Sequence, residues 1–177
     1  VDGAPRDRVR EVRAMADARR VPVRVVPAQD LDRAARGGVH QGVVAEVEGA
    51  PDYSVQDLVA AAPGPALLVV LDGIEDPHNV GAILRTVDAA GADGVVRQQR
   101  HSARLDGAAA KASAGAVAHV RVATVVNIAR ALGELKNAGV WTVGLAADAG
   151  ESYDQVDLTL PTAVVVGAEG LGLRRLV

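Results

Sequence analysis

The clearest pattern in the chain is a short continuous apolar run, Leu67–Leu71, followed by a loop and a regularly spaced apolar stripe. An apolar run this short and rich in Leu and Val predicts a strand that is buried on both faces. The stripe has the spacing of one helix face and consists of Val80, Ile83, Leu84 and Val87. Asn79 is expected to cap this helix and Gly91 to end it. The stretch therefore predicts a strand–loop–helix unit.

Strand-like and helix-like segments go on alternating after this unit. Further strands are expected at 94–96, 119–122, 140–145 and 163–166, and further helices at 106–114 and 126–138. Such alternation is typical of an α/β fold, in which a parallel sheet carries helices on both faces. Ligands of such sheets bind at the carboxyl ends of the strands. Any site is therefore expected in the loops that follow the strands.

The first third of the chain has a weaker pattern. Residues 5–20 predict a helix, 31–35 a second helical piece that ends at Gly37 and Gly38, and 23–26 and 42–47 two short strands. These elements indicate the end of a small α/β domain, which we assign to 1–48. We assign 49–66 to a linker, although its short helix, capped by Ser54 with Asp57 three residues later, would equally suit an ordered connector. The main domain is expected over 67–177.

Composition narrows the class of protein. The 177 residues include no Cys, which excludes disulfides, zinc thiolates and cysteine nucleophiles. The four His show no metal-ligand spacing, and no apolar run approaches the ~20 residues of a membrane span. A soluble, cytoplasmic protein without a metal site is expected. The net charge is −3, but the first 36 residues carry nine Arg against six Asp and Glu, which is a mild indication of an anionic partner.

The last predicted strand runs into a glycine-rich turn, Gly167-Ala168-Glu169-Gly170-Leu171-Gly172. Glycines at a strand end let a backbone approach a ligand closely, and they equally permit a plain tight turn. A dinucleotide site is disfavoured, because its glycines belong after the first strand of such a sheet. Because a glutamate carboxylate ordinarily carries a negative charge, Glu169 is expected to hold a cation or an Arg better than to donate a proton.

Arginines are the other candidates for chemistry. Arg85 lies off the apolar stripe, on the same side of the helix as Ala82 and Ala89. It is either a solvated surface residue or a contact to a partner chain or an anionic ligand. A loop is expected at 97–104, and its side chains are either solvated or bind phosphate in pairs of hydrogen bonds. Its arginines are Arg97, Arg100 and Arg104.

Two of these segments resemble motifs of a known family. Asn79-Val80-Gly81, with Arg85 six residues after the Asn, resembles the first motif of the SpoU-type (TrmH-like) RNA ribose 2′-O-methyltransferases. Gly167-Ala168-Glu169-Gly170 followed by Gly172 resembles their second motif. Val39-His40-Gln41-Gly42-Val43 resembles the end of the L30e-like RNA-binding domain that precedes the catalytic domain in some members. The third motif of the family, with its Ser-Leu-Asn segment, is absent from the 177 residues.

The resemblance implies a SPOUT-type domain tied in a deep trefoil knot, S-adenosylmethionine as cofactor, and a homodimer. It implies methylation of a ribose 2′-hydroxyl in RNA, and the chain looks most like members that modify a guanosine of 23S rRNA. Three alternatives stay open: a tRNA substrate, a non-catalytic RNA-binding relative, and a nucleotide-dependent oxidoreductase.

The resemblance also implies roles for individual residues. Asn79, Arg85 and Glu169 are expected to be catalytic. The expected cofactor contacts are Gly144, Leu145, Ala146, Gly167 and Gly170, and the expected RNA contacts are Arg97, Arg100 and Arg104. The family suggests Arg85 as general base, but a guanidinium is too basic to give up its proton readily. We expect Arg85 to anchor a phosphate, and the identity of the base stays open.

Overall fold

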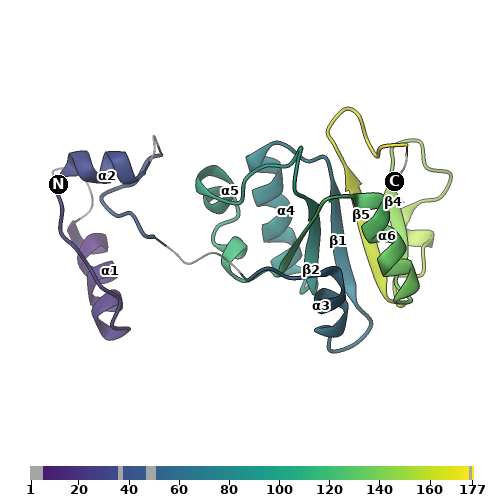
Figure 1. Cartoon of the computed structure of the whole chain (residues 1–177), viewed down its shortest axis with the longest axis horizontal. Coiled ribbons are helices and arrows are strands. Elements are labelled where there is room, and N and C mark those ends of the chain that lie inside the picture. Colours follow the sequence, from purple (N-terminus) through teal and green to yellow (C-terminus); the bar gives the residue numbers. More distant parts are fainter. Residues whose placement is uncertain (1–5, 36–37, 47–50, 176) are drawn as a thin grey trace. The chain divides into compact units, whose positions relative to one another are not determined.

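The computed structural model describes residues 6–35, 38–46, 51–175 and 177 of the chain (Figure 1). It consists of two compact units, Val1–Gly49 and Ala50–Val177. The two units are described separately below.

The first unit contains two helices, α1 (Arg6–Ala18) and α2 (Ala28–Ala34). The strands expected at 23–26 and 42–47 are wrong, because 21–27 and 42–46 carry no strand, while Val47 lies outside the described residues. The expected end of the second helix at Gly37 also lies outside them. A strand needs a neighbour to take up its backbone groups, and among the described residues this unit offers none.

A turn held by His40 replaces the second of these strands. The Nε2 of His40 lies 3.0 Å from Oδ1 of Asp32, and its Nδ1 accepts the N–H of Gly42 at 2.9 Å. Gln41 and Gly42 have φ angles of +47° and +89°, in the left-handed region that an extended strand excludes. His40 therefore ties this turn to α2.

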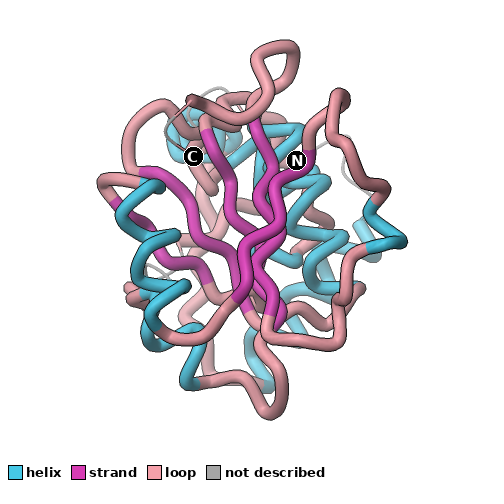
Figure 2. The backbone as a smooth tube through the Cα atoms, turned by 90° about the vertical axis from the view of Figure 1, so that its right-hand side faces the viewer, coloured by secondary structure: helices cyan, strands magenta, loops and turns pink. Residues whose placement is uncertain are grey.

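The second unit is built on one parallel sheet (Figure 2). Its strands are β1 (Leu67–Asp72), β2 (Gly94–Gln98), β3 (Val122–Val125), β4 (Trp141–Leu145) and β5 (Thr162–Gly167), in the order β3-β2-β1-β5-β4. All four pairings are parallel. The predicted α/β class is confirmed, and all five carboxyl ends lie at the same edge.

Helices cover both faces of this sheet (Figure 1). Helix α4 (Pro77–Ala89) packs on one face and α5 (Gly107–Ala112) packs against α4, while α3 (Val55–Ala60) and α6 (Ile128–Asn137) pack on the other face. Within β1, Leu68 and Val70 belong to the core on the α3–α6 side, and Leu71 belongs to the core on the α4 side. Both faces of the central strand are buried, as the apolar run predicts.

Helix α4 begins at Pro77, two residues before Asn79, so the predicted cap is wrong. Asp76 is the N-cap, its side chain accepts the N–H of His78 at 2.8 Å, and Pro77 occupies the first helical position. Proline is favoured at that position because its fixed φ suits the helix and because an N–H there would have no partner within the helix. Asn79 consequently lies inside the first turn, where its side chain does not cap the helix.

The end of α4 and the start of α3 agree with the sequence pattern. Gly91 has a φ of +67°, and the N–H of Ala92 donates to the carbonyl of Val87, which closes the helix with a left-handed residue. Ser54 and Asp57 form the predicted capping box at α3. Hydrogen bonds from the Ser54 hydroxyl and backbone N–H lower the pKa of the Asp57 carboxyl.

Two further boundaries differ from expectation. The strand expected at 119–122 is β3 at Val122–Val125, because the 3₁₀ turn Ala116–Ala118 is continued by hydrogen bonds from the N–H groups of His119 and Val120 to the carbonyl of Ala116. In the segment 49–66, α3 places Val55 and Leu58 in the core of the second unit. Of the two interpretations left open, an ordered connector therefore describes this segment from residue 51 on. The domain limits themselves stay a prediction.

None of the helices described here combines the length and the apolar character that a membrane span requires. The cytoplasmic location and the trefoil knot both stay predictions.

The burial of Leu84 gives a test of this core. Leu84 has 0% exposure in the core between α4 and the sheet. We expect Leu84→Ala to lower the free energy of unfolding by about 2–5 kcal/mol, because it removes buried methyl groups and leaves a cavity. The matched control is Leu171→Ala, since Leu171 is 87% exposed; we expect a change within about 0.5 kcal/mol there. Equal effects of the two variants in denaturant titrations would contradict the assigned core.

Candidate functional site

The candidate site lies at the carboxyl ends of β1 and β5, which are neighbours in the sheet. Asp72 at the end of β1 stands in register with Gly167 at the end of β5. One loop leads from β1 to the start of α4, and the glycine-rich turn leads on from β5. Between them, Nδ2 of Asn79 donates a hydrogen bond to Oε2 of Glu169 at 3.0 Å. The two motif segments, 90 residues apart in sequence, thus meet at one edge.

The glycine-rich turn closes on itself through backbone hydrogen bonds. The N–H of Ala168 donates to the carbonyl of Gly172 at 3.0 Å, and the N–H of Gly172 donates to the carbonyl of Ala168 at 2.8 Å. Gly170 and Gly172 have φ angles of +76° and +64°. A Cβ on Gly167 would lie 2.2 Å from the carbonyl carbon of Gly172. Position 167 therefore needs a glycine because of the close backbone packing within the turn, whether or not the turn binds a ligand.

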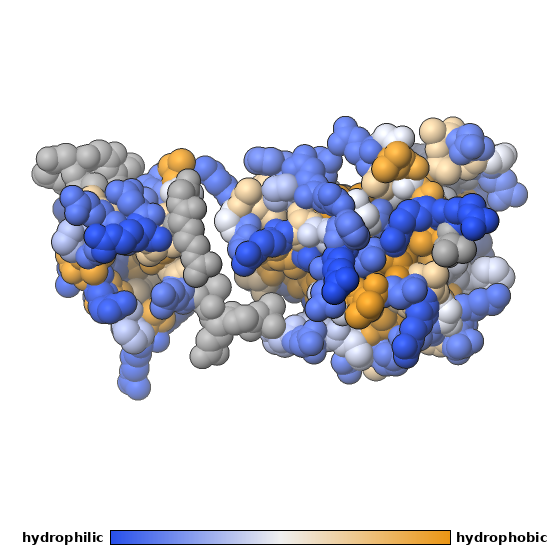
Figure 3. All heavy atoms as spheres, turned by 45° about the horizontal axis from the view of Figure 1, so that its top comes forward, coloured by the Kyte–Doolittle hydropathy of each residue, from blue (hydrophilic) through white to orange (hydrophobic). Residues whose placement is uncertain are grey.

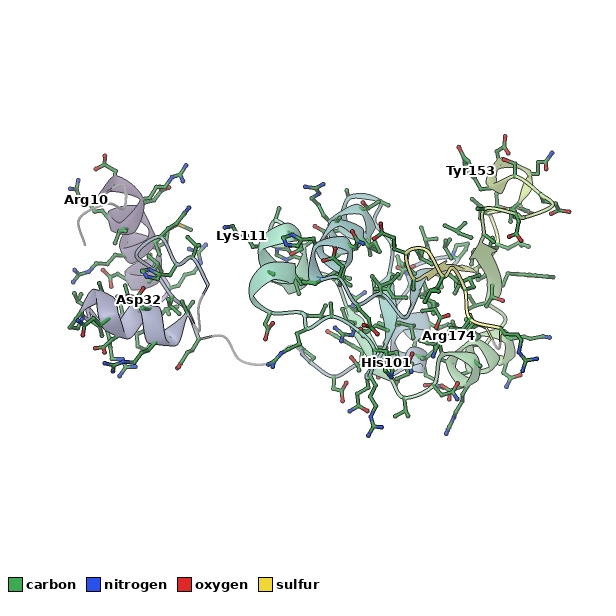
Figure 4. All side chains as sticks on the ribbon, turned by 90° about the horizontal axis from the view of Figure 1, so that it is seen from above. Arg10, Asp32, His101, Lys111, Tyr153 and Arg174 are labelled. Carbon is green, nitrogen blue, oxygen red and sulfur yellow. The ribbon has the colours of Figure 1, made fainter. Side chains whose placement is uncertain are left out.

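A buried ion pair holds the segment that follows this turn. Asp72 has 0% exposure. Its Oδ2 accepts the backbone N–H of Arg174 at 2.9 Å and its Oδ1 accepts Nε of the same residue at 2.6 Å, with Nη2 also in contact. Figure 4 shows Arg174 well apart from Tyr153 in the loop after β4. The sequence analysis missed this pair, although a carboxylate ending a fully apolar buried strand was a usable signal.

The expected cofactor residues lie on adjacent strand ends. Gly144 and Leu145 of β4 pair in register with Val165 and Val166 of β5, directly before Gly167. A Cβ on Gly144 would lie 2.7 Å from Cδ1 of Leu173, so this glycine makes room for that side chain. Gly144, Leu145 and Ala146 are exposed. The fold thus brings the expected cofactor residues to one edge, while their role stays a prediction.

Apolar side chains also reach the surface of the second unit. Figure 3 brings the top of Figure 1 forward and shows hydrophobic and hydrophilic residues interspersed over the unit. Leu145 is 44% exposed and Trp141 of the same strand is 66% exposed. An exposed apolar side chain beside glycine backbone suits a ligand with a flat ring and polar edges.

Arg85 lies apart from the Asn79–Glu169 pair. It is exposed on α4, as are Ala82 and Ala89. Six residues of helix separate it from Asn79, a rise of about 9 Å along the axis. Within one chain the structure therefore does not place Arg85 beside the other two expected catalytic residues.

The predicted arginine loop is wrong for Arg97. β2 continues to Gln98, so Arg97 lies inside the strand and is only 8% exposed. Its Nε is enclosed without a hydrogen-bond partner among the described residues, and burial lowers the pKa of its guanidinium. Arg100 and Arg104 are exposed, as expected, and Arg104 lies 2.9 Å from Asp106. The exposed loop therefore presents two of the three expected arginines.

A cavity of about 360 Å³ lies at the ends of β2 and β3, next to Gln98, Asn127, Arg174 and Arg175. It is lined by α6 and not by the Asn79–Glu169 pair. Across the described residues, no three His, Asp or Glu side chains gather where they would hold a metal ion.

Comparison with models of known families identifies the family to which this chain belongs. A model described as the SpoU rRNA Methylase family matches residues 66–177, and a model described as RNA 2′-O ribose methyltransferase substrate binding matches residues 2–53. The chain belongs to the SpoU rRNA methylase family. The match of the first 53 residues places them with the substrate-binding segments of such proteins.

Individual SpoU relatives agree with this assignment. The chain is 42% identical over 178 residues to the 23S rRNA (guanosine-2′-O-)-methyltransferase RlmB of Pseudomonas syringae pv. tomato, which covers 99% of this chain and 71% of that protein. The SpoU methyltransferase AviRb of Streptomyces viridochromogenes, solved in complex with AdoMet, matches 70% of this chain with a TM-score of 0.61 and 25% identity. The chain spans about half of the AviRb chain (50%).

An rRNA methyltransferase structure from Sinorhizobium meliloti extends the fold similarity to 96% of this chain and 64% of that one. Its TM-score is 0.71 at 23% identity, which supports the fold alone.

Gly167 provides a test of the turn geometry. We expect Gly167→Ala to destabilise the second unit by about 1–3 kcal/mol, because the added Cβ would overlap backbone that cannot move independently of the turn. Gly150→Ala is the matched control, since a Cβ there meets nothing within 4 Å. Denaturant titration measures both variants. A destabilisation by Gly150→Ala as large as that by Gly167→Ala would contradict the assigned close approach.

Proposed function

We propose that this protein transfers the methyl group of S-adenosylmethionine to a ribose 2′-hydroxyl in RNA. The observation that carries the proposal is the hydrogen bond between Asn79 and Glu169, which joins the two motif segments at the carboxyl edge of a parallel sheet. This is the edge at which such folds bind ligands. Membership of the SpoU family supplies the reaction class.

Within this class we favour a guanosine of 23S rRNA as the substrate. RlmB of Pseudomonas syringae carries that activity in its name, and it is similar to this chain over nearly the whole length. Other relatives are named as tRNA/rRNA methyltransferases, for example in Mycolicibacterium vanbaalenii, at 45% identity over 97% of this chain. A tRNA substrate is therefore the alternative within the class.

The residues present fit S-adenosylmethionine at the ends of β4 and β5. The AviRb structure contains this cofactor, and its sulfonium supplies the methyl group that is transferred. Gly144, Leu145 and Ala146 present exposed backbone and one apolar side chain on the edge next to Gly167 and Gly170. Backbone groups of this kind hold a ligand at a fixed angle, and in-line displacement depends on such positioning.

The roles of Asn79, Glu169 and Arg85 follow from their chemistry. We assign Asn79 and Glu169 to the geometry around the reacting nucleotide, since each orients the other. We assign Arg85 to a phosphate of that nucleotide, because a guanidinium binds phosphate oxygens two at a time and keeps its charge. Arg100 and Arg104 of the exposed loop are assigned to further phosphates. The base that removes the 2′-hydroxyl proton stays open.

Arg85 reaches the reacting nucleotide most readily from a second copy of the chain. Its distance along α4 from Asn79 separates it from the Asn79–Glu169 pair of its own chain. The exposed alanines on its side of the helix, Ala82 and Ala89, leave room for another backbone to approach. We therefore propose a homodimer in which each α4 contributes its Arg85 to the site of the partner.

Methyl transfer by the full-length protein tests the reaction. Radiolabelled S-adenosylmethionine is supplied with 23S rRNA or with tRNA, and the labelled nucleoside is identified after digestion. We expect label on the 2′-oxygen of a guanosine in the rRNA. Label in tRNA would support the alternative substrate, and no label in either RNA would support a non-catalytic relative.

An Arg85→Lys variant tests the phosphate anchor. We expect kcat to fall by roughly 10²-fold. The ammonium group of Lys cannot form the paired hydrogen bonds that a guanidinium forms with phosphate, so the nucleotide would shift in the site. The matched control is Arg130→Lys, an exposed arginine of α6 whose only ion pair among the described residues is with Glu134. Near-wild-type turnover of Arg85→Lys would remove Arg85 from any essential role.

A further inference from the structure

We propose that Asp72 is a positioning residue of this site, which acts through Arg174 to hold Glu169 in reach of Asn79. The proposal rests on the function proposed above. Asp72 contacts neither Asn79 nor Glu169 in any described hydrogen bond, so it acts through the backbone of the turn that carries Glu169.

The burial of Asp72 explains why it binds Arg174. Asp72 is fully buried, and a buried carboxylate is costly unless hydrogen bonds and an opposite charge compensate it. Arg174 supplies both, through its backbone N–H and its guanidinium. The side chain of Arg174 is 50% exposed. Arg174 therefore covers the buried carboxylate at the end of β1 and itself faces solvent.

The contact between Asp72 and Arg174 helps to immobilise the segment that carries Glu169. The segment 168–174 is anchored at three points: the Ala168–Gly172 backbone bridge, the side chain of Leu173 against Gly144, and Arg174 on Asp72. Glu169 lies inside the loop that the first anchor closes, and the other two anchors hold the end of that loop against β4 and β1. The contact of Asp72 with the N–H of Arg174 fixes backbone, so it limits how far the turn moves as a whole.

Glu169 needs such support because its own hydrogen bond is weak. Its hydrogen bond to Asn79 is exposed to solvent, and exposed polar contacts contribute little stability of their own. The Asn79–Glu169 geometry therefore cannot hold the turn in place. The turn must hold that geometry, and the contact of Arg174 with the buried carboxylate of Asp72 is the anchor with the strongest hydrogen bonds.

A double-mutant cycle in the full-length protein tests the proposal. The variants are Asp72→Asn, Glu169→Gln and the double variant, and kcat for methyl transfer is measured for each. We expect Asp72→Asn to lower kcat about tenfold or more in the wild-type background. In the Glu169→Gln background we expect little further loss, because both substitutions act on the same geometry.

The matched control is Thr162→Val. Thr162 is 1% exposed and its hydroxyl donates to the carbonyl of Leu160 at 2.8 Å, at the opposite end of β5. Its substitution removes a buried polar contact without touching the turn, so any effect on kcat is expected to multiply with that of Glu169→Gln. If the effects of Asp72→Asn and Glu169→Gln also multiply, Asp72 is merely structural and the proposal is overturned.

Hydrogen exchange separates this proposal from the proposed function. We expect Asp72→Asn, but not Thr162→Val, to speed amide exchange over residues 168–174. If exchange changes in this way but the wild type transfers no methyl group, the proposed function is overturned, and with it the effect of Asp72 on catalysis. Unchanged exchange in an active enzyme would overturn the positioning role alone. If Asp72→Asn does not fold, the cycle is repeated with Arg174→Ala. We expect this variant to lower kcat by a smaller factor, and to lower it little further when it is combined with Glu169→Gln. If the two factors multiply in the double variant, the proposal is overturned.

Discussion

The parallel pairing of β1 with β5 is the constraint on which the rest of the second unit depends. These strands are separated by nearly 90 residues of chain, yet they are neighbours at the centre of the sheet. Parallel pairing places both carboxyl ends at one edge, so the loops that follow them must share that space. Asn79 and Glu169 meet there because their strands are paired, and not because either residue attracts the other strongly.

Local hydrogen bonding decides which side chains are free to act at that edge. Asp76 and Pro77 satisfy the start of α4, which leaves the side chain of Asn79 available to Glu169. In the same way, the turn after β5 satisfies its own backbone through Ala168 and Gly172. The carboxylate of Glu169 is then presented by a closed turn, while the glycine at 167 allows the backbone of Gly172 to approach closely.

Burial separates residues that look alike in sequence. Arg97 and Arg100 are three positions apart, and both were expected to contact RNA. Arg97 lies inside β2, where its Nε is enclosed, and Arg100 lies on the exposed loop. Asp72 and Asp76 show the same contrast, since one is fully buried under Arg174 and the other caps a helix. Their spacing in the sequence does not carry this difference.

The sequence by itself determined the alternation of strands and helices, the buried central strand, the capping box at Ser54 and the end of α4 at Gly91. These features depend on contacts within a few residues and on apolar periodicity, which are visible in one dimension. The tertiary structure alone decided the strand order, the burial of Arg97, the pairing of Asp72 with Arg174 and the absence of strands at 23–26 and 42–46. Each of these depends on a partner far along the chain, or on the lack of one among the described residues, and no local pattern specifies such a partner.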